Sequence, residues 1–306
     1  MMTPDFEIAK EVLRVRMSQL LVNEEYKKGA FVIPIHLALG HEAVAVAISR
    51  CMRDADALVL SHRNIHYNLA RLGRLGPILA EYRLKAEGVG AGAMGSMNLA
   101  NPGRGIAYTS SILGNNLGVA AGLAFAHRLR GTGGVVFVET GDGAMEEGAF
   151  YEALEFAASR RLAMVALVEN NEWSLATHIS ERRCDISLER LCGAFAITHI
   201  ALEGNDVYRY IEALAGARDS AAAGGPVCVD VRIHTLGGWI KKTSDCPQGR
   251  YVNYHAGPAA NISADDWPLI ESSDADPVFV LVRRFGEARL REAALELAAE
   301  LAAEAG

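Results

Sequence analysis

The stretch VVFVETGDGAMEEGAFYEALEFAASRRLAMVALVENN (residues 135–171) decides the fold class. Its β-branched run at 135–138 is typical of a buried parallel strand, and the glycine turn that follows leads into helical periodicity over 147–161. The run at 164–170 predicts a second buried strand. Strand, turn, helix and strand in this order form the unit of a doubly wound parallel sheet with flanking helices, so we predict an α/β fold.

The rest of the chain fits the same class. Apolar spacing predicts further helices at 5–28, 40–53, 76–87, near 205–220 and at 279–304. Two more strands are predicted at 197–202 and 227–233, and 236–278 is expected to be irregular. With no internal repeat and no linker, we predict a single domain over 1–306, with N-terminal helices within 5–53 and a C-terminal helix at about 279–304.

The composition excludes several classes of protein. The 306 residues are 50% hydrophobic with a formal net charge of −7, which argues against a basic face for nucleic acid. No apolar run reaches the roughly 18 residues of a membrane span, and the N-terminus is predicted to be a first helix rather than a signal peptide. The five cysteines are scattered without a CxxC pair, so we expect reduced thiols, no zinc site and a cytoplasmic protein. Neither nucleic acid nor membrane is expected as a partner.

Both strands of the opening stretch end in side chains that suit a hard cation. The first leads into Gly141-Asp142-Gly143 and the second into Glu169-Asn170-Asn171. Ligands of parallel sheets bind at the carboxyl ends of the strands. A carboxylate and a carboxamide beside phosphate oxygens suit magnesium, and glycine lets the backbone approach a phosphate closely. Each motif alone is also a common turn or loop, so the inference depends on finding both.

Taken together, with 29 residues from Asp142 to Asn171, the two motifs resemble the signature of thiamine diphosphate enzymes. Over about residues 5–235 the chain resembles the alpha subunits of the decarboxylating first component of 2-oxo acid dehydrogenase complexes, such as pyruvate, branched-chain and acetoin dehydrogenases. This resemblance implies the diphosphate-type domain of the thiamine diphosphate-binding fold, with thiamine diphosphate and Mg²⁺ as cofactors. It implies Asp142 and Asn171 as side-chain ligands of the metal, and Trp173 as a backbone-carbonyl ligand.

The resemblance extends upstream of the glycine turn. IHLALGHEAVAVAI (35–48), SHRNIHYNLARLG (61–73) and GSMNLA (95–100) are each similar to a segment of the family. A forked, permanently charged arginine suits a diphosphate. By resemblance, His36 and His66 are catalytic and line the channel to the reactive carbon, although histidines at such positions are also common in cores and loops. The cofactor-binding residues implied by the resemblance are His62, Arg63, Leu113, Gly114, Asn115, Gly141, Asp142, Gly143, Ala144 and Asn171.

Two departures from the family pattern affect the expected site. His62 stands where the family usually has tyrosine. The family's later arginine-histidine loop is replaced by IHTLGGWIKK (233–242), which resembles a transketolase segment. NYHAGPAANISADD (253–266) also resembles transketolase, with a histidine, glycine and proline ahead of an acidic helix start. His255 is therefore expected to contact the diphosphate and to be catalytic, with an irregular surface loop as the alternative interpretation.

The resemblance implies an alpha-type subunit of a two-component enzyme. The reaction expected first is cleavage of a small 2-oxo acid by decarboxylation, with transfer of the acyl unit to a lipoyl group or another carrier. A split transketolase-like subunit that moves a two-carbon ketol unit between sugars is the alternative. A beta-type subunit would carry the aminopyrimidine-side domain and its catalytic carboxylate, usually in a heterotetramer. A non-catalytic scaffold is disfavoured by the intact Asp142, Asn171 and Arg63, and a nucleotide-binding domain by the lack of a G-x-x-x-x-G-K-[ST] loop.

Overall fold

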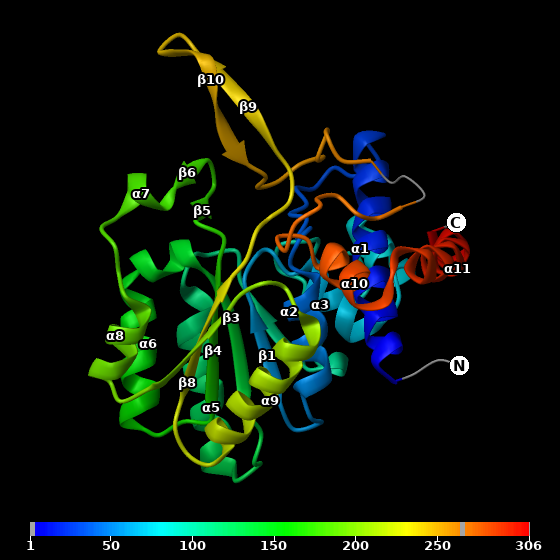
Figure 1. The fold of residues 1–306 in the computed structure, drawn as a ribbon. Coiled ribbons are helices and arrows are strands. Elements are labelled where there is room, and N and C mark those ends of the chain that lie inside the picture. Colours follow the sequence, from blue (N-terminus) through cyan, green and yellow to red (C-terminus); the bar gives the residue numbers. More distant parts are fainter. Residues whose placement is uncertain (1–3, 264–266, 306) are drawn as a thin grey trace.

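A six-stranded parallel sheet forms the centre of the molecule (Figure 1), in a computed structural model that describes residues 4–263 and 267–305. The strand order is β2-β1-β3-β4-β8-β7, and every neighbouring pair is parallel. The strands are β1 (Ala57–Leu60), β2 (Ile106–Thr109), β3 (Val136–Gly141), β4 (Met164–Asn170), β7 (Thr198–Leu202) and β8 (Val227–Arg232). The predicted doubly wound α/β class is confirmed.

Helices cover both faces of this sheet because side chains alternate along each strand. Phe137 and Val165 point into the core shared with α1, α2 and α9, whereas Val138 and Ala166 point into the core beneath α5, α6 and α8. The helices are α1 (Pro4–Lys27), α2 (Glu42–Cys51), α3 (Ile65–Leu72), α4 (Gly76–Tyr82), α5 (Asn115–Arg130), α6 (Gly148–Ser159), α7 (Ile179–Arg182), α8 (Leu188–Ala194), α9 (Val207–Ala222), α10 (Pro277–Phe285) and α11 (Glu287–Ala305). None of those in the described part of the chain combines the length and apolarity needed to cross a bilayer.

The register between β3 and β4 positions the two sequence motifs. The strands pair from Val136 opposite Met164 to Gly141 opposite Glu169. Their carboxyl ends are therefore level, so the turn after β3 and the loop after β4 begin side by side.

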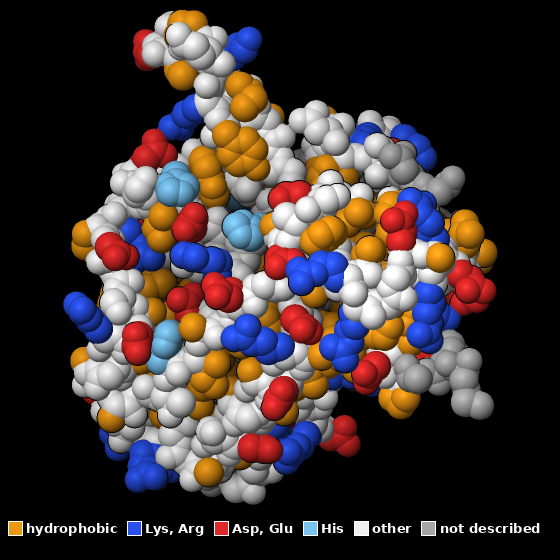
Figure 2. All heavy atoms as spheres, viewed as in Figure 1, with side chains coloured by type: hydrophobic (Ala, Val, Ile, Leu, Met, Phe, Trp, Pro, Cys, Tyr) orange, Lys and Arg blue, Asp and Glu red, His pale blue; other side chains and the backbone are white. Residues whose placement is uncertain are grey.

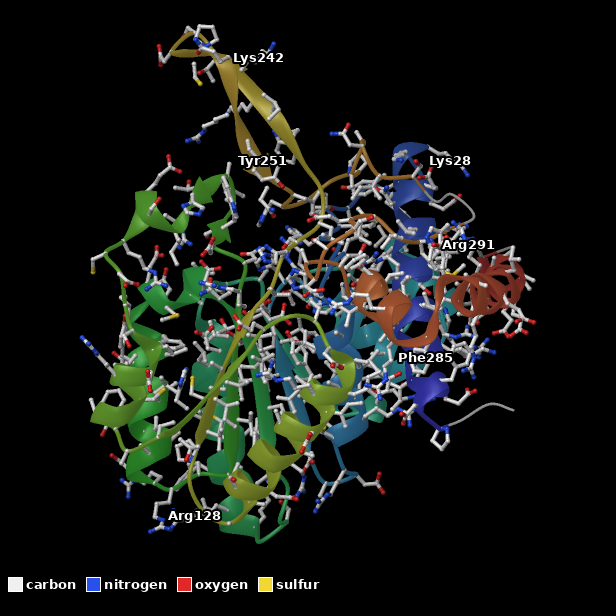
Figure 3. All side chains as sticks on the ribbon, in the orientation of Figure 1. Lys28, Arg128, Lys242, Tyr251, Phe285 and Arg291 are labelled. Carbon is white, nitrogen blue, oxygen red and sulfur yellow. The ribbon has the colours of Figure 1, made fainter. Side chains whose placement is uncertain are left out.

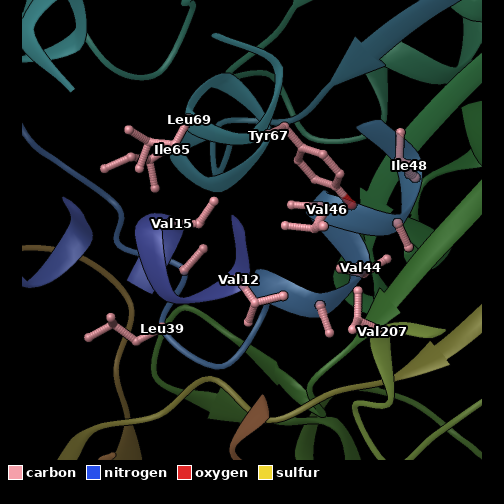
Figure 4. Close-up of a cluster of buried hydrophobic side chains, with 14 of the residues drawn as sticks. Val12, Val15, Leu39, Val44, Val46, Ile48, Ile65, Tyr67, Leu69 and Val207 are labelled. Atoms are coloured by element: carbon pink, nitrogen blue, oxygen red, sulfur yellow. The ribbon is translucent and has the colours of Figure 1, made fainter. Parts of the chain in front are cut away.

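Elements from the two ends of the chain pack together beside the sheet (Figure 1). Lys10 of α1 pairs with Glu296 of α11 at 2.7 Å. Figure 4 shows Val12 of α1 and Val44 of α2 in the same apolar cluster as Leu69 of α3. The predicted helices of the N-terminal 53 residues are confirmed as α1 and α2.

A buried ion cluster fastens this layer. Arg16 of α1, which is fully buried, donates to Glu42 of α2 at 2.6 and 3.0 Å. It also donates to Asp276, the residue before α10, at 3.0 and 3.2 Å. Asp276 in turn caps α10 by accepting from the Val278 amide at 2.9 Å. One guanidinium thus joins three segments that are far apart in the sequence.

We predict that Arg16→Met lowers the free energy of unfolding by about 3 kcal/mol or more, because it leaves two buried carboxylates without their cation. Arg291→Met is the control, since the ion pair of Arg291 with Glu287 is exposed and contributes little. Urea unfolding of both variants measures the difference. Equal, small losses would show that the buried cluster does not stabilise the packing of α1 on α10.

Several elements differ from the sequence predictions. The predicted helix at 76–87 ends at Tyr82, because Glu81 accepts from the amides of the glycine-rich loop, including Gly90 at 2.7 Å and Gly95 at 3.0 Å. The single helix predicted at 279–304 is two helices, α10 and α11, separated by Gly286 with a φ of 82°. Strands β1 and β2 and helices α3, α7 and α8 were not predicted.

The stretch 236–278 is only partly irregular. It contains an antiparallel hairpin formed by β9 (Gly238–Thr243) and β10 (Cys246–Asn253). Residues 264–266, at the predicted acidic helix start, lie outside the described residues, as do residues 1–3 and 306 of the predicted domain.

Candidate functional site

A pocket lies at the carboxyl ends of the central strands. Its walls come from the segments after β1, β3 and β4, from the start of α5, and from the segment after β10. The predicted site residues that line it are His62, Arg63, Leu113, Gly114, Gly141, Asp142, Gly143, Asn171, Trp173 and His255. Residues more than a hundred positions apart in the sequence therefore meet at the carboxyl ends of parallel strands, which is where such sheets bind their ligands.

The turn after β3 presents Asp142 to this pocket. Its side chain is 1% exposed, and a short 3-10 helix (Asp142–Glu146) follows it. A Cβ atom on Gly143 would lie 2.7 Å from the Ser174 hydroxyl, so only glycine lets the segment after β4 pack this closely on the turn.

Asn171 faces the same pocket from the end of β4. Its side-chain amide donates to the Thr235 hydroxyl at 2.8 Å, and its side-chain oxygen accepts from the Trp173 amide at 3.1 Å. The carboxamide is thereby held in one orientation beside the turn that carries Asp142. The two predicted metal-ligand side chains line one pocket, as the register of β3 and β4 requires.

Arg182 was not predicted as a site residue. It reaches back from α7 to Asp142, with Nη2 2.5 Å from the carboxylate, and it also pairs with Glu146. Burial raises the pKa of Asp142, and the charge and hydrogen bond of Arg182 oppose that shift. No sequence motif indicated this contact, because the pair is 40 residues apart and forms only through the tertiary fold.

Arg63 is a buried cation with few polar partners. It is 9% exposed and donates only to backbone carbonyls, those of Leu37 and of His255, the latter at 3.1 Å. Within the described residues it forms no ion pair. Burial lowers its pKa, and the charges of Glu169 and Glu139 only partly oppose this. A guanidinium in this state suits an incoming anion with several acceptor oxygens.

Three of the predicted histidines gather around Arg63. The His36 ring lies 4.7 Å from His62 and 4.9 Å from His255, centroid to centroid, and the latter two are 5.6 Å apart. Burial, and then the charge of Arg63, lowers the pKa to about 2 for His36, about 3 for His62 and about 4 for His255. All three imidazoles are therefore neutral at pH 7 and can each donate or accept a hydrogen bond.

His66 does not lie in this cluster. It is fully buried in α3, with Nε2 3.4 Å from the carboxylate of Glu169. It belongs to a network that also contains His41, whose Nδ1 lies 2.5 Å from Glu169, and the Tyr67 hydroxyl. Glu169 and His41 line the pocket, whereas His66 and Tyr67 do not. The position of His66 suits orientation of Glu169 better than contact with a ligand.

Two further predicted residues lie at the edge of the site. Asn115 accepts a hydrogen bond from the Tyr108 hydroxyl at 2.9 Å, and its neighbour Asn116 lines the pocket in its place. Ala144 is fully buried behind the turn. Gly114, with a φ of 74°, lets the chain enter α5 at the pocket wall.

Two glutamates of the pocket were also not predicted as site residues. Glu139 accepts from the Ser61 amide at 2.9 Å and from its hydroxyl at 3.1 Å. Burial, together with the charge of Glu169, raises the pKa of Glu139 to about 8. Burial also opposes ionisation of Glu169, but His41 and His66 outweigh it and hold the pKa of Glu169 well below its usual range. One carboxyl group is thus protonated and the other ionised near neutral pH.

We predict that His62→Asn weakens the acid sensitivity of the fold. An unfolded histidine gains a proton near pH 6.5, whereas folded His62 stays neutral until about pH 3, so stability falls as the pH drops below 6.5. The loss of unfolding free energy between pH 7.5 and 5.5 should be about 1 kcal/mol smaller in the variant. Urea unfolding at each pH measures this loss. At pH 8 the ring is neutral in both the folded and the unfolded state, so the difference in unfolding free energy between variant and wild type there reflects packing alone. Identical pH profiles would contradict the neutral-imidazole cluster.

Comparisons with known proteins agree with this geometry. Residues 10–247 match the family described as Dehydrogenase E1 component. The pyruvate dehydrogenase E1 component subunit alpha of Zymomonas mobilis is 28% identical over 235 residues, covering 76% of this chain and 66% of that protein. The subunit alpha of the Bacillus subtilis acetoin:2,6-dichlorophenolindophenol oxidoreductase is 29% identical over 216 residues, covering 71% and 65%. The chain thus spans about two thirds of the length of these curated relatives.

Solved structures show the same fold with little sequence identity. A transketolase mutant from Pichia stipitis, in complex with xylulose-5-phosphate, superposes with a TM-score of 0.60 at 15% identity. The match covers 96% of this chain and 46% of the transketolase chain. The predicted resemblance to dehydrogenase alpha subunits is confirmed. Transketolase-like features were predicted only for the segments 233–242 and 253–266, and the solved structures show that the likeness is one of overall fold.

Proposed function

The chain belongs to the dehydrogenase E1 component family, and from this we propose that it is the alpha-type subunit of a two-component thiamine diphosphate enzyme. The enzyme would decarboxylate a small 2-oxo acid and transfer the acyl unit to a carrier or another acceptor. The observation that carries the proposal is the meeting of Asp142, Asn171 and Arg63 in one pocket. Metal-ligand oxygens and a buried cation without an ion-pair partner form a site for a metal diphosphate.

Proteins of this family use thiamine diphosphate with a divalent metal ion such as Mg²⁺, and the pocket residues fit both. Asp142 and Asn171 would hold the metal through their side chains, and Trp173 through its carbonyl. Arg63 and His62 would contact the diphosphate, beside the backbone of Gly141 to Ala144. Leu113 and Gly114 would contact the aminopyrimidine, whereas the side chain of Asn115 is bonded to Tyr108. When bound, the cofactor supplies the carbon nucleophile for cleavage of the 2-oxo acid.

The chain's own residues would prepare this site before the reaction. Arg182 holds the carboxylate of Asp142, and Thr235 holds the amide of Asn171. His62 and His255 line the pocket as neutral hydrogen-bonding groups, while Arg63 supplies the positive charge. A substrate carboxylate or carbonyl oxygen would thus meet uncharged donors near a fixed cation.

A beta-type partner subunit is part of the proposal. The relatives carry the name subunit alpha. In this chain the pocket wall includes apolar side chains that are largely exposed, with Ile112 at 69%, Leu113 at 44% and Leu175 at 64%. Apolar groups beside a ligand pocket suit coverage by another chain, which would bring the aminopyrimidine-side carboxylate. A lipoyl or other carrier group is the proposed acceptor, and the cytoplasm the proposed location.

One observation favours the alternative, a split transketolase-like subunit. His255 follows the segments that resemble transketolase, and its ring packs against His36 and lines the pocket. Several neutral imidazoles suit the hydroxyl groups of a sugar substrate as well as the oxygens of a small oxo acid.

We predict that Asp142→Ala abolishes magnesium-dependent cofactor binding, because it removes the anionic ligand of the metal. Calorimetric titration of the chain, together with its partner, with thiamine diphosphate and Mg²⁺ measures the loss. Asp185→Ala, on an exposed position after α7, is the control and should bind as wild type. Unchanged affinity in the Asp142 variant, with the far-ultraviolet spectrum intact, would refute the metal assignment.

The reaction itself gives a second prediction. The purified chain alone should show no turnover. Combined with a beta-type dehydrogenase subunit from the same organism, it should release carbon dioxide from a small 2-oxo acid, followed by reduction of an artificial electron acceptor. Transfer of a ketol unit from xylulose 5-phosphate to an aldose phosphate, without decarboxylation, would select the transketolase-like alternative. Activity of the chain shown by mass spectrometry to lack any partner would refute the two-component proposal.

A further inference from the structure

The hairpin of β9 and β10, residues Gly238–Asn253, forms an arm that projects from the body (Figure 1). Its two strands pair only with each other, not with the six-stranded sheet. The match to the dehydrogenase family ends at residue 247, near the start of β10. A two-stranded sheet without a covered face is at best marginally stable in water, so the packing of this arm needs an explanation.

The base of the arm is fixed at the candidate site. Thr235, three residues before β9, accepts from the Asn171 amide at 2.8 Å, and His255, two residues after β10, lines the pocket. Arg250 of the arm donates to Glu181 of α7 at 2.8 Å, and the Tyr251 ring lies 6.0 Å from that of Trp173. The arm therefore rises from the pocket mouth.

Beyond its base, the arm exposes large apolar side chains. Trp239 is 42% exposed, Ile240 58% and Tyr251 49%. Ile240 and Tyr251 are cross-strand partners, and each lies over a glycine of the opposite strand, Gly249 and Gly238 respectively. Figure 2 shows hydrophobic side chains along the projecting arm. Apolar groups displayed in this way are typical of a surface that binds another protein.

The arm is basic, although the chain is acidic. Between Gly238 and Asn253 there are three basic residues and one acidic residue, a net charge of +2, whereas the whole chain carries −7. Lys241 stands opposite Arg250 in the register, and like charges in such positions repel. Within the described residues, Lys241 and Lys242 form no ion pair. Figure 3 places Lys242 near the tip and Tyr251 nearer the body.

We propose that this arm docks on the beta-type partner subunit that completes the site, against an apolar patch flanked by carboxylates. The inference rests on the proposed function. The pocket mouth, where that partner must face the cofactor, also carries the exposed Ile112, Leu113 and Leu175. Apolar side chains are thus exposed both on the arm and on the rim from which it rises, and the rings of Tyr251 and Trp173 connect the two. Pairing of two arms from two copies is disfavoured, because it would bring their basic side chains together.

Docking at the arm would also act on the site. The two strands continue directly into Thr235 and His255, so immobilising the arm restrains both residues. The partner would thus fix the hydrogen bond from Asn171 to Thr235 as well as close the pocket. This gives the arm a positioning role in addition to its contribution to assembly.

The test compares matched variants of the whole chain, mixed with the purified beta-type dehydrogenase subunit encoded by the same genome. The first removes apolar surface from the arm (Trp239→Ser with Ile240→Ser), and the second reverses its charge (Lys241→Glu with Lys242→Glu). Leu129→Ser is the control, since Leu129 is 71% exposed in the last turn of α5, a helix that begins at the pocket and ends far from the arm (Figure 3). Calorimetry gives the dissociation constant, and light scattering gives the assembly. Melting temperatures verify that each variant is folded.

The apolar variant should weaken binding to the beta-type subunit at least tenfold. The charge variant should slow association, with an effect that shrinks as salt is added, and the control should bind as wild type. In the wild-type complex, backbone amides of residues 239–251 should exchange hydrogen more slowly than in the free chain.

Three outcomes would overturn the inference, and they are distinguishable. Failure of the wild-type chain itself to bind the beta-type subunit would refute both the proposed function and the proposed partner of the arm. Normal binding by both arm variants, with no protection of the arm amides, would refute docking of the arm but not the proposed function. If the variants lose self-association of the free chain but retain the mixed complex, the occupant is a second copy of this chain.

Discussion

The buried carboxylate of Glu169, at the end of β4, is contacted by two other segments and linked through His41 to a third. His41 contacts one of its oxygens at 2.5 Å, while the Tyr67 hydroxyl donates to the other and His66 lies 3.4 Å from it. The second nitrogen of His41 lies 2.8 Å from the Thr235 hydroxyl, which also accepts from Asn171. A carboxylate this deeply buried must be compensated, so the segment before α2, helix α3 and the segment before the arm are all held in place around it. Asn171, a proposed metal ligand, is oriented through this network by way of Thr235.

The charges of the pocket follow from the same constraint. Because His41 and His66 keep Glu169 ionised, its charge favours the protonated form of Glu139, and neither carboxyl group forms an ion pair with Arg63. The cation is left with backbone carbonyls and neutral imidazoles as its surroundings. Under the proposed function the pocket thereby separates two roles: the carboxylate of Asp142 would bind the metal, and the guanidinium of Arg63 would bind phosphate oxygens. A metal diphosphate has a cation that would face Asp142 and phosphate oxygens that would face Arg63.

Local pattern explains which parts of this arrangement could be predicted. The strands β3 and β4 are continuous apolar runs with a glycine turn and an amide pair at their ends, so the fold class and the meeting of Asp142 and Asn171 at neighbouring strand ends could be predicted from the sequence. Strand β1 is only four residues long, and the hairpin is exposed on both faces, so neither has the periodicity that prediction needs. Arg182 and Glu139 enter the site through tertiary contacts without a motif. His66 was expected in the pocket, but α3 turns its side chain toward Glu169 instead. The apolar spacing at 279–304 gave no sign of the break between α10 and α11, which occurs at Gly286.

The similarity to dehydrogenases and the similarity to transketolase extend over different lengths of the chain. The sequence match to dehydrogenases ends at residue 247, while the structural likeness to transketolase covers 96% of the chain. The dehydrogenase match includes the whole sheet and the turn that carries Asp142, and the transketolase fold covers almost all of the chain. The proposed metal side of the site therefore does not distinguish the two proposed reactions. The dehydrogenase match ends inside one continuous stretch, which contains Thr235, the arm and His255. This stretch contributes a pocket-lining imidazole at one end and exposed apolar surface in the middle. We therefore expect the choice of substrate and the choice of partner to be encoded together here, because a change in the arm cannot be isolated from the residues that it holds at the pocket.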